Sequence, residues 1–354
     1  MKLPFKQHLR QEYYSLLDQV FDSNMWSDGK MMRQFETDFS RMVKCESRAV
    51  SSGGAGLLAC FQFLELDGGE VIVPTNTFWA TTRAIQMAGG VPIFADISKD
   101  DLCLSVSELK NLITNKTKAV VVVHIGGHIA FQIHEIVAIC KENNIPLIED
   151  CAHAHGATIE NKAAGTFGFA GAYSFYATKS LPTGDGGMVV SENNEFIKWV
   201  EKWRNYGKKI KDGVVTYPIQ NGFNFRMNEF TAALGVIQVK YFPEIMEWKK
   251  ALALKFDQIF ERRVKLPDNV ISGFYKYIVW DYPELNYKTG QVFGIIDLNH
   301  NIAKSSRNLT TAEWVACHHQ CPPIWYGWEH AEKSVDEIAS ILLTGSKNIL
   351  PRQE

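Results

Sequence analysis

Short apolar runs alternate with amphipathic stretches along the first half of the chain. The runs predict buried strands at residues 71–73, 91–95, 119–123 and 146–149. The segments between the runs carry apolar residues at helical spacing, which predicts helices at residues 78–88, 105–113 and 133–143. Strands that alternate with helices in this way predict the α/β fold class, with a mostly parallel central sheet flanked by helices.

Further helices are predicted on both sides of this alternating region. Their ranges are 1–25, 31–43, 57–66, 194–205 and 228–261. A break in the last helix is expected near Pro243, because proline removes a backbone donor from the helix interior. This helix is the expected bridge to a second unit. We therefore predict a large domain at residues 1–245 and a smaller C-terminal α+β domain at residues 246–354.

The stretch from Ala172 to Ser191 places a single lysine between two apolar runs. Lys179 follows the strand-forming residues 173–176, and a glycine turn at 184–187 separates it from the second run. Its aromatic and small apolar neighbours would desolvate the amine, and desolvation favours the neutral form over the ammonium. A neutral amine can bond a carbonyl compound such as pyridoxal phosphate (PLP). On its own, however, the pattern is more often that of a surface lysine beside a hairpin.

Two other features fall where ligands bind in open α/β sheets, beyond the carboxyl ends of the strands. Residues 50–56 form a small-residue turn that runs into a helix, and its backbone N–H groups could approach a phosphate. Asp150 ends a predicted strand and could face a positively charged ring nitrogen. Taken alone, the turn is also typical of an ordinary helix start, and such an aspartate is more often a helix cap.

The composition narrows the class of partners. The net charge of the 354 residues is −2, with no basic surplus, so no nucleic-acid partner is predicted. No run is long enough to span a membrane, the N-terminus has no signal-peptide core, and the seven cysteines are scattered, so we expect a cytoplasmic protein without membrane association. No G-x-G-x-x-G fingerprint follows a strand, which argues against a nicotinamide dehydrogenase.

A metal site is considered where Cys317 and Cys321 bracket two histidines. No second pair of ligands is evident nearby, and two prolines follow at once. We therefore predict no metal.

Several motifs, in order and in register from about Trp26 to Tyr241, resemble the sugar aminotransferases of the DegT/DnrJ/EryC1/StrS family. These are PLP enzymes with the aspartate aminotransferase fold, also called fold type I. The resemblance begins at the turn Ser52-Gly53. Its other motifs are VIVPTNTFWAT, GGVPIFADI, IPLIEDCAHAHGA, SFYATKSLPTGDGG and NFRMNEFTAALG. Linked motifs at this spacing make a surface role for Lys179 a poor alternative.

The resemblance implies roles for individual residues. Lys179 matches the lysine that bonds PLP, and Asp150 matches the carboxylate that pairs with the pyridine nitrogen. Phe78 falls where an aromatic ring stacks on the pyridine, and His153 falls where the family often has glutamine near the ring hydroxyl. The positions implied around the cofactor phosphate are Gly53, Gly54, Ser174 and Asn224. The asparagine comes from the neighbouring subunit in the family, so the resemblance implies a homodimer.

The implied activity is transfer of an amino group from glutamate to a keto-sugar, carried on a nucleotide, in the synthesis of amino sugars and polysaccharides. Two alternatives stay open. One is a PLP enzyme of another type, such as a lyase or dehydratase, or an aminotransferase that acts on a non-nucleotide ketone. The other is a non-catalytic relative. Sugar dehydratases of the family carry histidine in place of the lysine, so Lys179 argues against that branch.

The sequence departs from the family pattern in two places. The usual Ser-Gly-Thr is Ser52-Gly53-Gly54 here, so one hydroxyl contact to the phosphate is expected to be missing. The chain from about Tyr275 onward matches poorly. Because that part of the family helps to shape the substrate pocket, the resemblance says least about the identity of the sugar.

Overall fold

The computed structural model describes residues 7–282 and 291–324. A seven-stranded sheet forms its centre, in the order β1-β9-β8-β5-β4-β2-β3. Its strands are β1 (Ser47–Val50), β2 (Glu70–Pro74), β3 (Val91–Ala95), β4 (Thr117–Val123), β5 (Leu147–Asp150), β8 (Ala170–Ser174) and β9 (Gly187–Val190). β9 runs antiparallel to β1 and β8, and the other six strands of this sheet share one direction. The predicted strands and the mostly parallel sheet are confirmed.

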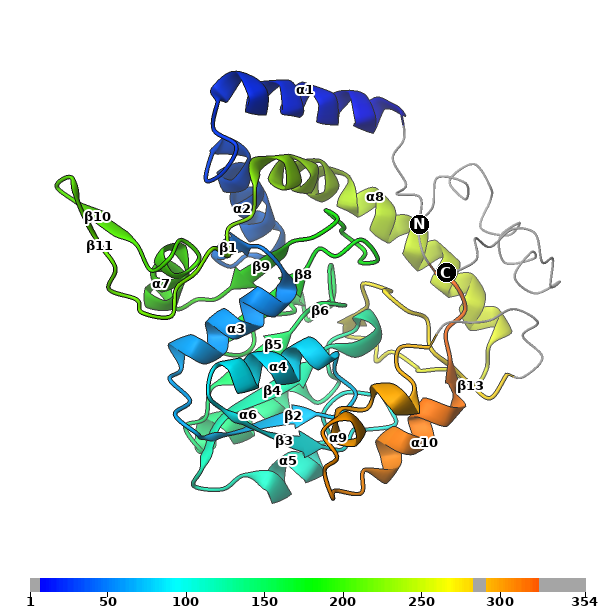
Figure 1. Ribbon diagram of the computed structural model, residues 1–354. Helices are drawn as coiled ribbons and strands as arrows, with labels where there is room; N and C mark the ends of the chain where they lie inside the picture. Colours follow the sequence, from blue (N-terminus) through cyan, green and yellow to red (C-terminus); the bar gives the residue numbers. More distant parts are fainter. Residues whose placement is uncertain (1–6, 283–290, 325–354) are drawn as a thin grey trace.

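Helices flank this sheet (Figure 1). They are α1 (Gln7–Ser23), α2 (Lys30–Val43), α3 (Gly53–Phe63), α4 (Trp79–Met87), α5 (Val106–Leu112), α6 (Ile133–Glu142), α7 (Asn194–Trp203), α8 (Glu229–Ile259), α9 (Asn299–Ile302) and α10 (Thr310–His318), with short 3₁₀ turns at Ile125–Gly127 and Ile295–Asp297. The centre of the sheet is shielded from solvent, because every residue of Val120 to Val123 in β4 is buried. Apolar strands buried on both faces are what a parallel sheet covered by helices requires.

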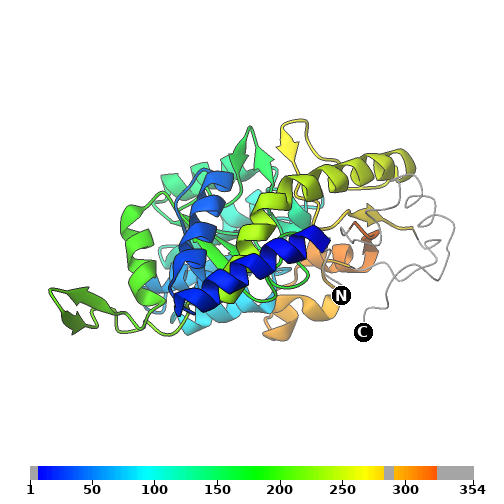
Figure 2. The same ribbon diagram turned by 90° about the horizontal axis from the view of Figure 1, so that it is seen from above.

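Smaller sheets and a hairpin complete the described part. A three-stranded sheet joins β6 (Thr158–Ile159), β7 (Lys162–Ala163) and β12 (Val270–Ile271), and a two-stranded one joins β13 (Val279–Trp280) and β14 (His319–Gln320). The hairpin of β10 (Lys209–Lys211) and β11 (Val214–Thr216) projects away from the body in both ribbon views (Figures 1 and 2).

The predicted start of α3 and the predicted break in α8 are wrong. α3 begins at Gly53 rather than at residue 57, because the Ser52 hydroxyl accepts a hydrogen bond from the Ala55 N–H and caps the helix there. α8 continues through Pro243 without the expected break. Its neighbours Phe242 and Ile245 are buried, so packing on both sides of the proline holds the helix together. The predicted domain boundary after residue 245 falls inside α8, and the division into two domains stays a prediction.

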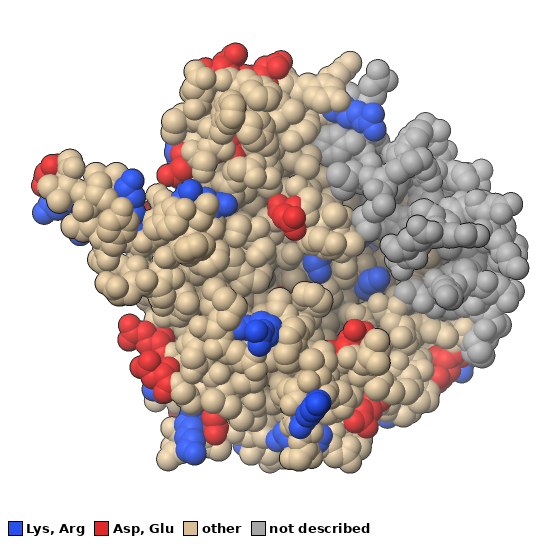
Figure 3. All heavy atoms as spheres, viewed as in Figure 1, with Lys and Arg blue, Asp and Glu red and all other residues tan. Residues whose placement is uncertain are grey.

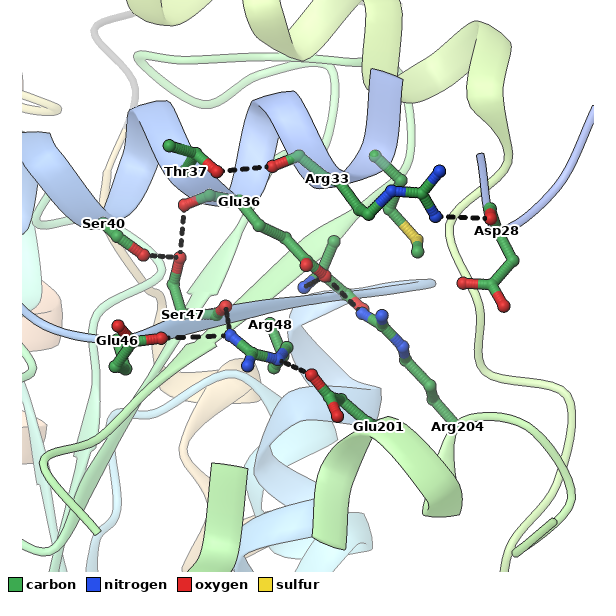
Figure 4. A network of polar contacts seen from close by, with 12 residues as sticks. Asp28, Arg33, Glu36, Thr37, Ser40, Glu46, Ser47, Arg48, Glu201 and Arg204 are labelled. Atoms are coloured by element: carbon green, nitrogen blue, oxygen red, sulfur yellow. Dashed lines mark hydrogen bonds and ion pairs between the residues drawn. The ribbon is translucent and has the colours of Figure 1, made fainter. Parts of the chain in front are cut away.

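A buried ion pair fixes β1, the strand that leads into α3. Glu36 of α2 and Arg204, which follows α7, lie 2.5 Å apart and are almost fully buried (Figure 4). Glu36 also accepts from the Ala49 N–H, and Arg204 donates to the Ala49 carbonyl. The ion pair therefore provides hydrogen-bond partners for both the N–H and the carbonyl of Ala49 in β1.

We expect Glu36→Ala to lower the free energy of unfolding by about 3–5 kcal/mol, because it leaves the Arg204 guanidinium buried without its partner. Glu46→Ala is the matched control. Glu46 pairs with Arg48 on the same strand but is largely exposed, so its loss is expected to cost at most about 1 kcal/mol. Urea unfolding monitored by circular dichroism compares the two variants. Equal losses of unfolding free energy in the two variants would show that the buried pair stabilises the fold no more than the exposed one.

Candidate active site

The site lies at the carboxyl edge of the sheet. Because β1, β2, β5 and β8 run in the same direction, their ends meet at one edge. Gly53 follows β1 and Phe78 follows β2, while Asp150 and Ser174 end β5 and β8. Four of the predicted site residues therefore reach the same edge from separate parts of the sequence.

The N-terminus of α3 packs against the end of β8. A Cβ on Gly53 would lie 2.7 Å from Ser174 Cβ, so only glycine fits at this position. A Cβ on Gly54 would instead meet the Ala80 side chain at 3.7 Å, an ordinary contact. The first N–H groups of a helix have no partner within the helix, and the helix dipole favours negative charge there. This end of α3 can thus take an anion between Ser174 and the start of α4.

Asp150 is buried and held by two hydrogen bonds. One carboxylate oxygen accepts from the Thr81 hydroxyl at 2.9 Å, and the other accepts from the Ala152 N–H at 3.1 Å. Thr77 and Thr81 share a hydrogen bond of 2.7 Å between their hydroxyls. Since Thr81 gives its proton to Asp150, Thr77 must donate to Thr81. The carboxylate is therefore oriented by the loop after β2 and the first turns of α4.

That loop is in turn held by the C-terminal part of the chain. The Asn299 side-chain amide donates to the Thr77 carbonyl at 2.6 Å and to the Thr75 carbonyl at 3.1 Å, and its oxygen accepts from the Thr82 hydroxyl. The next residue, His300, bonds the Thr75 hydroxyl at 2.7 Å. Asn299 and His300 are fully buried. A segment more than 200 residues away thus positions the loop that orients Asp150.

Phe78 is the N-cap residue of α4, at the same edge. Its side chain is 79% exposed, in contrast to Thr77 and Thr81 on either side of it, which are buried. A phenyl ring left open to solvent at a strand end is a surface on which a flat ring can stack.

Lys179 and His153 meet through a third residue, Tyr275. The Tyr275 ring stacks on the His153 imidazole with a centroid distance of 4.1 Å, and Lys179 Nζ lies 4.8 Å from the centroid of the Tyr275 ring. His153 Nδ1 is buried and has no hydrogen-bond partner among residues 7–282 and 291–324. Burial, followed by the charge of Lys179, holds the pKa of His153 well below its usual value, so its imidazole is neutral at pH 7.

A buried lysine of α8 joins the two segments that carry this cluster. Lys249 Nζ donates at 3.0 Å to Ser180 Oγ, next to Lys179, and at 3.0 Å to the Phe274 carbonyl, next to Tyr275. Burial, together with the charge of Lys276, lowers the pKa of Lys249 to about 7. In the unfolded chain an exposed lysine keeps its proton up to about pH 10.4.

The depressed pKa of Lys249 predicts a pH dependence of stability. Between about pH 7 and pH 10 the unfolded chain binds a proton at Lys249 that the folded chain does not, so stability rises with pH. We expect Lys249→Met to remove about 2 kcal/mol of the rise in unfolding free energy between pH 7 and pH 9. Lys250→Met, at the exposed next position of α8, is expected to keep the rise. Urea unfolding of the three proteins at both pH values measures it, and equal rises would contradict the assignment.

Another group of possible metal ligands lies deeper, at His124, Glu149 and Cys151. The Glu149 carboxylate accepts from the His124 ring and from the N–H groups of Gly165, Phe167 and Gly168. The second His124 nitrogen accepts from the Ala130 N–H. Hydrogen bonds thus occupy the His124 ring and the Glu149 carboxylate, and those of Glu149 tie the loop before β8 to β5.

Hydrogen bonds also occupy a histidine of the candidate metal site that Cys317 and Cys321 bracket. One His319 nitrogen donates to the Val315 carbonyl at 2.6 Å, and the other accepts from the Val292 N–H at 2.9 Å. Neither nitrogen of His319 is therefore available to a metal.

Asn224 is held near the start of α3 by backbone contacts around it. Its side chain is exposed, and its backbone forms a bridge with Asn205. The next residue, Phe225, accepts a backbone hydrogen bond from Ser51, just before α3. Asn224 is thus anchored near the start of α3, and its side chain is exposed.

The residues at this edge fit PLP, which the structure does not contain. The N-terminus of α3 suits the phosphate, the exposed Phe78 ring suits the face of the pyridine, and Asp150 offers a fixed negative charge. His153 Nδ1, which is buried and has no partner within the described part of the chain, is suited to a hydrogen bond with a ring oxygen.

The sequence did not single out Thr81, Asn299, Lys249 or Tyr275. Thr81 lies within the motif VIVPTNTFWAT, so a motif-by-motif reading could have found it. The other three lie beyond the quoted motifs, and only the fold brings them to the site.

The surface charge and the hydropathy of the described residues do not point to a further binding partner. On the face shown in Figure 3, basic and acidic side chains are interspersed and do not gather into a patch of one sign. Within residues 7–282 and 291–324, each helix is too short or too polar to cross a bilayer.

Comparison with known proteins shows which family the chain resembles. The family model of the DegT/DnrJ/EryC1/StrS aminotransferase family matches residues 7–272. A GDP-perosamine synthase of Vibrio cholerae is 36% identical over 244 residues, which cover 67% of this chain and 65% of that protein. The chain thus spans a little under two-thirds of this relative. A dTDP-4-dehydro-2,3,6-trideoxy-D-glucose 4-aminotransferase of Saccharopolyspora spinosa is 30% identical, with 79% of this chain and 78% of the relative covered.

The fold is also that of solved aminotransferases. Helicobacter pylori PseC, an aminotransferase involved in the biosynthesis of pseudoaminic acid, superposes with a TM-score of 0.82 at 24% identity. The match covers 96% of this chain and 97% of PseC. The predicted fold class is confirmed, and the chain has the fold type I architecture.

Proposed function

The chain belongs to the DegT/DnrJ/EryC1/StrS aminotransferase family, and on this basis we propose that it is a PLP-dependent aminotransferase acting on a nucleotide-linked keto-sugar. Glutamate is the proposed amino donor. The observation that carries the proposal is the convergence of the Lys179 loop, Asp150 and the N-terminus of α3 at one edge of the sheet. An amine, a carboxylate and an anion site in this arrangement match the three parts of PLP that a protein must hold.

We propose that Lys179 bonds the cofactor and that Asp150 faces its ring nitrogen. Gly53, Gly54 and Ser174 would hold the phosphate, with Phe78 against one face of the ring and His153 beside its hydroxyl. When bound, PLP supplies an electron sink that stabilises negative charge at the α-carbon of an attached amino acid. Asp150 keeps the ring nitrogen protonated, because opposite charges stabilise each other in a buried site.

The protein's own proton carrier in this reaction is Lys179. Its Nζ would take the proton that leaves the α-carbon of glutamate, as a general base, and would then give it to the cofactor instead of back to that carbon, as a general acid. Thr81 keeps the Asp150 carboxylate in place during both stages through its hydrogen bond to Oδ2. The neutral imidazole of His153 can donate or accept a hydrogen bond without adding charge to the site.

The names of the relatives support the substrate class. The Vibrio cholerae relative is named for a GDP-linked amino sugar, and the Saccharopolyspora spinosa relative is named as a 4-aminotransferase of a dTDP-linked keto-sugar. We therefore propose a role in amino-sugar biosynthesis, in the cytoplasm. The seven cysteines of the chain are free thiols, which supports a reducing compartment.

A homodimer is part of the proposal. The projecting hairpin carries the apolar side chains of Ile210 and Val214, each 62% exposed, and Phe223 beside Asn224 is 62% exposed as well. Apolar side chains that extend from the body in this way support contact with a second copy of the chain. We propose that Asn224 reaches the cofactor phosphate of that second copy.

The proposed activity is tested with ¹⁵N-glutamate and a panel of GDP-, dTDP- and UDP-linked keto-sugars. Mass spectrometry should show transfer of ¹⁵N to one sugar and formation of 2-oxoglutarate in equal amount. Release of ammonia or pyruvate without any need for glutamate would instead identify a lyase. Transfer to a free ketone but to no nucleotide sugar would identify the other alternative substrate class.

A further inference from the structure

The position of Lys179 in the structure assigns a role to Tyr275. Lys179 Nζ lies over the face of the Tyr275 ring, 4.8 Å from its centroid, and His153 stacks on the same ring at 4.1 Å. The Tyr275 hydroxyl lies 3.3 Å from the Thr178 hydroxyl, next to the lysine. The ring therefore contacts both the reactive amine and the residue placed beside the cofactor hydroxyl.

This contact is built by the fold. The segment with Tyr275 is bonded to the turn after β4, since Gly273 donates to the Gly127 carbonyl at 2.6 Å and Lys276 donates to the Gly126 carbonyl at 2.8 Å. Gly127 has φ +107°, and a Cβ there would lie 2.5 Å from the Tyr275 nitrogen. From the other side, Lys249 Nζ bonds both Ser180 and Phe274, so the lysine loop and the tyrosine segment are held together.

We propose that Tyr275 is a further catalytic residue, whose ring holds the Lys179 amine whenever that amine is not bonded to the cofactor. This inference rests on the proposed function. In that reaction Lys179 Nζ is an ammonium between taking the proton from the α-carbon and delivering it to the cofactor. The face of an aromatic ring carries partial negative charge and stabilises an ammonium at this distance. The ring thus keeps the loaded amine beside the reacting atoms, instead of letting it turn toward water.

The neighbouring charges agree with a contact to an ammonium. Burial raises the pKa of the Tyr275 phenol, but the charges of Lys179 and Lys276 and the hydrogen bond with Thr178 outweigh burial and leave that pKa below its usual value. Lys276 Nζ is farther from the ring, at 5.5 Å from the centroid. Lys179 is therefore the closer of the two cations.

The first test uses protein without cofactor, so that it does not depend on turnover. Lys179 is acetylated with acetic anhydride at pH 7 and at pH 11, and the modified peptide is quantified by mass spectrometry. The rate at pH 11, where most of an ordinary lysine amine is neutral, chiefly reports access of the reagent. The ratio of the two rates then reports how strongly the site favours the ammonium.

In Tyr275→Leu the ratio of the rate at pH 7 to that at pH 11 is expected to rise about two- to five-fold, because the ring is gone. Tyr275→Phe keeps the ring and should stay close to the unchanged protein. Tyr277→Phe is the matched control, since Tyr277 lies two positions away and bonds Asp257 rather than the lysine loop. An unchanged ratio in Tyr275→Leu would overturn the inference.

The second test uses the PLP-loaded enzyme. Tyr275→Leu should lower kcat for amino transfer about tenfold with little change in the KM for glutamate, and Tyr275→Phe should restore most of it. If the unchanged protein shows no PLP bound to Lys179, the proposed function fails while the acetylation result still stands. If PLP is bound but Tyr275→Leu changes neither the acetylation ratio nor kcat, only the role of Tyr275 fails.

Discussion

Lys179→Ala is expected to abolish the covalent link to PLP and to lower kcat by a factor of about 10³–10⁴ or more. The substitution removes both the group that bonds the cofactor and the base that moves the proton. PLP should still bind, since the N-terminus of α3 and Asp150 are unchanged, but its spectrum should be that of the free aldehyde. Absorption spectra and a coupled assay for 2-oxoglutarate measure the two effects.

The control for this variant is Lys198→Ala, at an exposed position of α7. It should keep both the spectrum and the rate. Mass spectrometry after borohydride reduction locates the bound cofactor, which should be on the peptide with Lys179 in the control and absent in Lys179→Ala. Full turnover by Lys179→Ala would rule out the proposed mechanism.

Asp150→Asn should lower kcat by a factor of about 10²–10³ while the cofactor stays bonded to Lys179. Asparagine keeps the shape of the side chain and can still accept the Thr81 hydrogen bond, but it carries no charge to hold the ring nitrogen protonated. A fixed charge aimed at a developing charge is worth roughly this factor in other enzymes. The measurement is the single-turnover rate of the glutamate half-reaction.

Thr81→Val gives a graded comparison. It removes the hydrogen bond to Asp150 Oδ2 but leaves the negative charge in place, so a loss of about tenfold is expected. If Asp150→Asn were as active as Thr81→Val, the charge of Asp150 would have no role beyond that of a hydrogen-bond acceptor.

The parts of the fold that depend on local pattern could be predicted from the sequence. β2 to β5 appear as short apolar runs, and β3 is found at the predicted residues. Capping and packing explain the errors. The start of α3 is decided by the Ser52 side chain, and the continuity of α8 through Pro243 depends on burial of its neighbours, which no local rule contains.

The candidate site could be predicted only as far as its residues lie in motifs. Asp150 and Lys179 lie within the quoted motifs. Their neighbours in the sequence indicate a strand end for Asp150 and a loop between two apolar runs for Lys179. Asn299 acts on residues 222 and 224 positions earlier, and Tyr275 meets a lysine loop about 100 positions earlier. Such contacts are set by the packing of the C-terminal part on the sheet edge, so no spacing in the sequence indicates them.

The central claim is that Lys179 holds PLP and that glutamate takes the cofactor through the first half of an amino transfer. The most direct measurement is the absorption spectrum of the purified protein with PLP, before and after glutamate is added. We expect a visible band of lysine-linked PLP that gives way to the shorter-wavelength band of the aminated cofactor. The absence of any visible band would contradict the claim, because Lys179 would then not be a cofactor lysine.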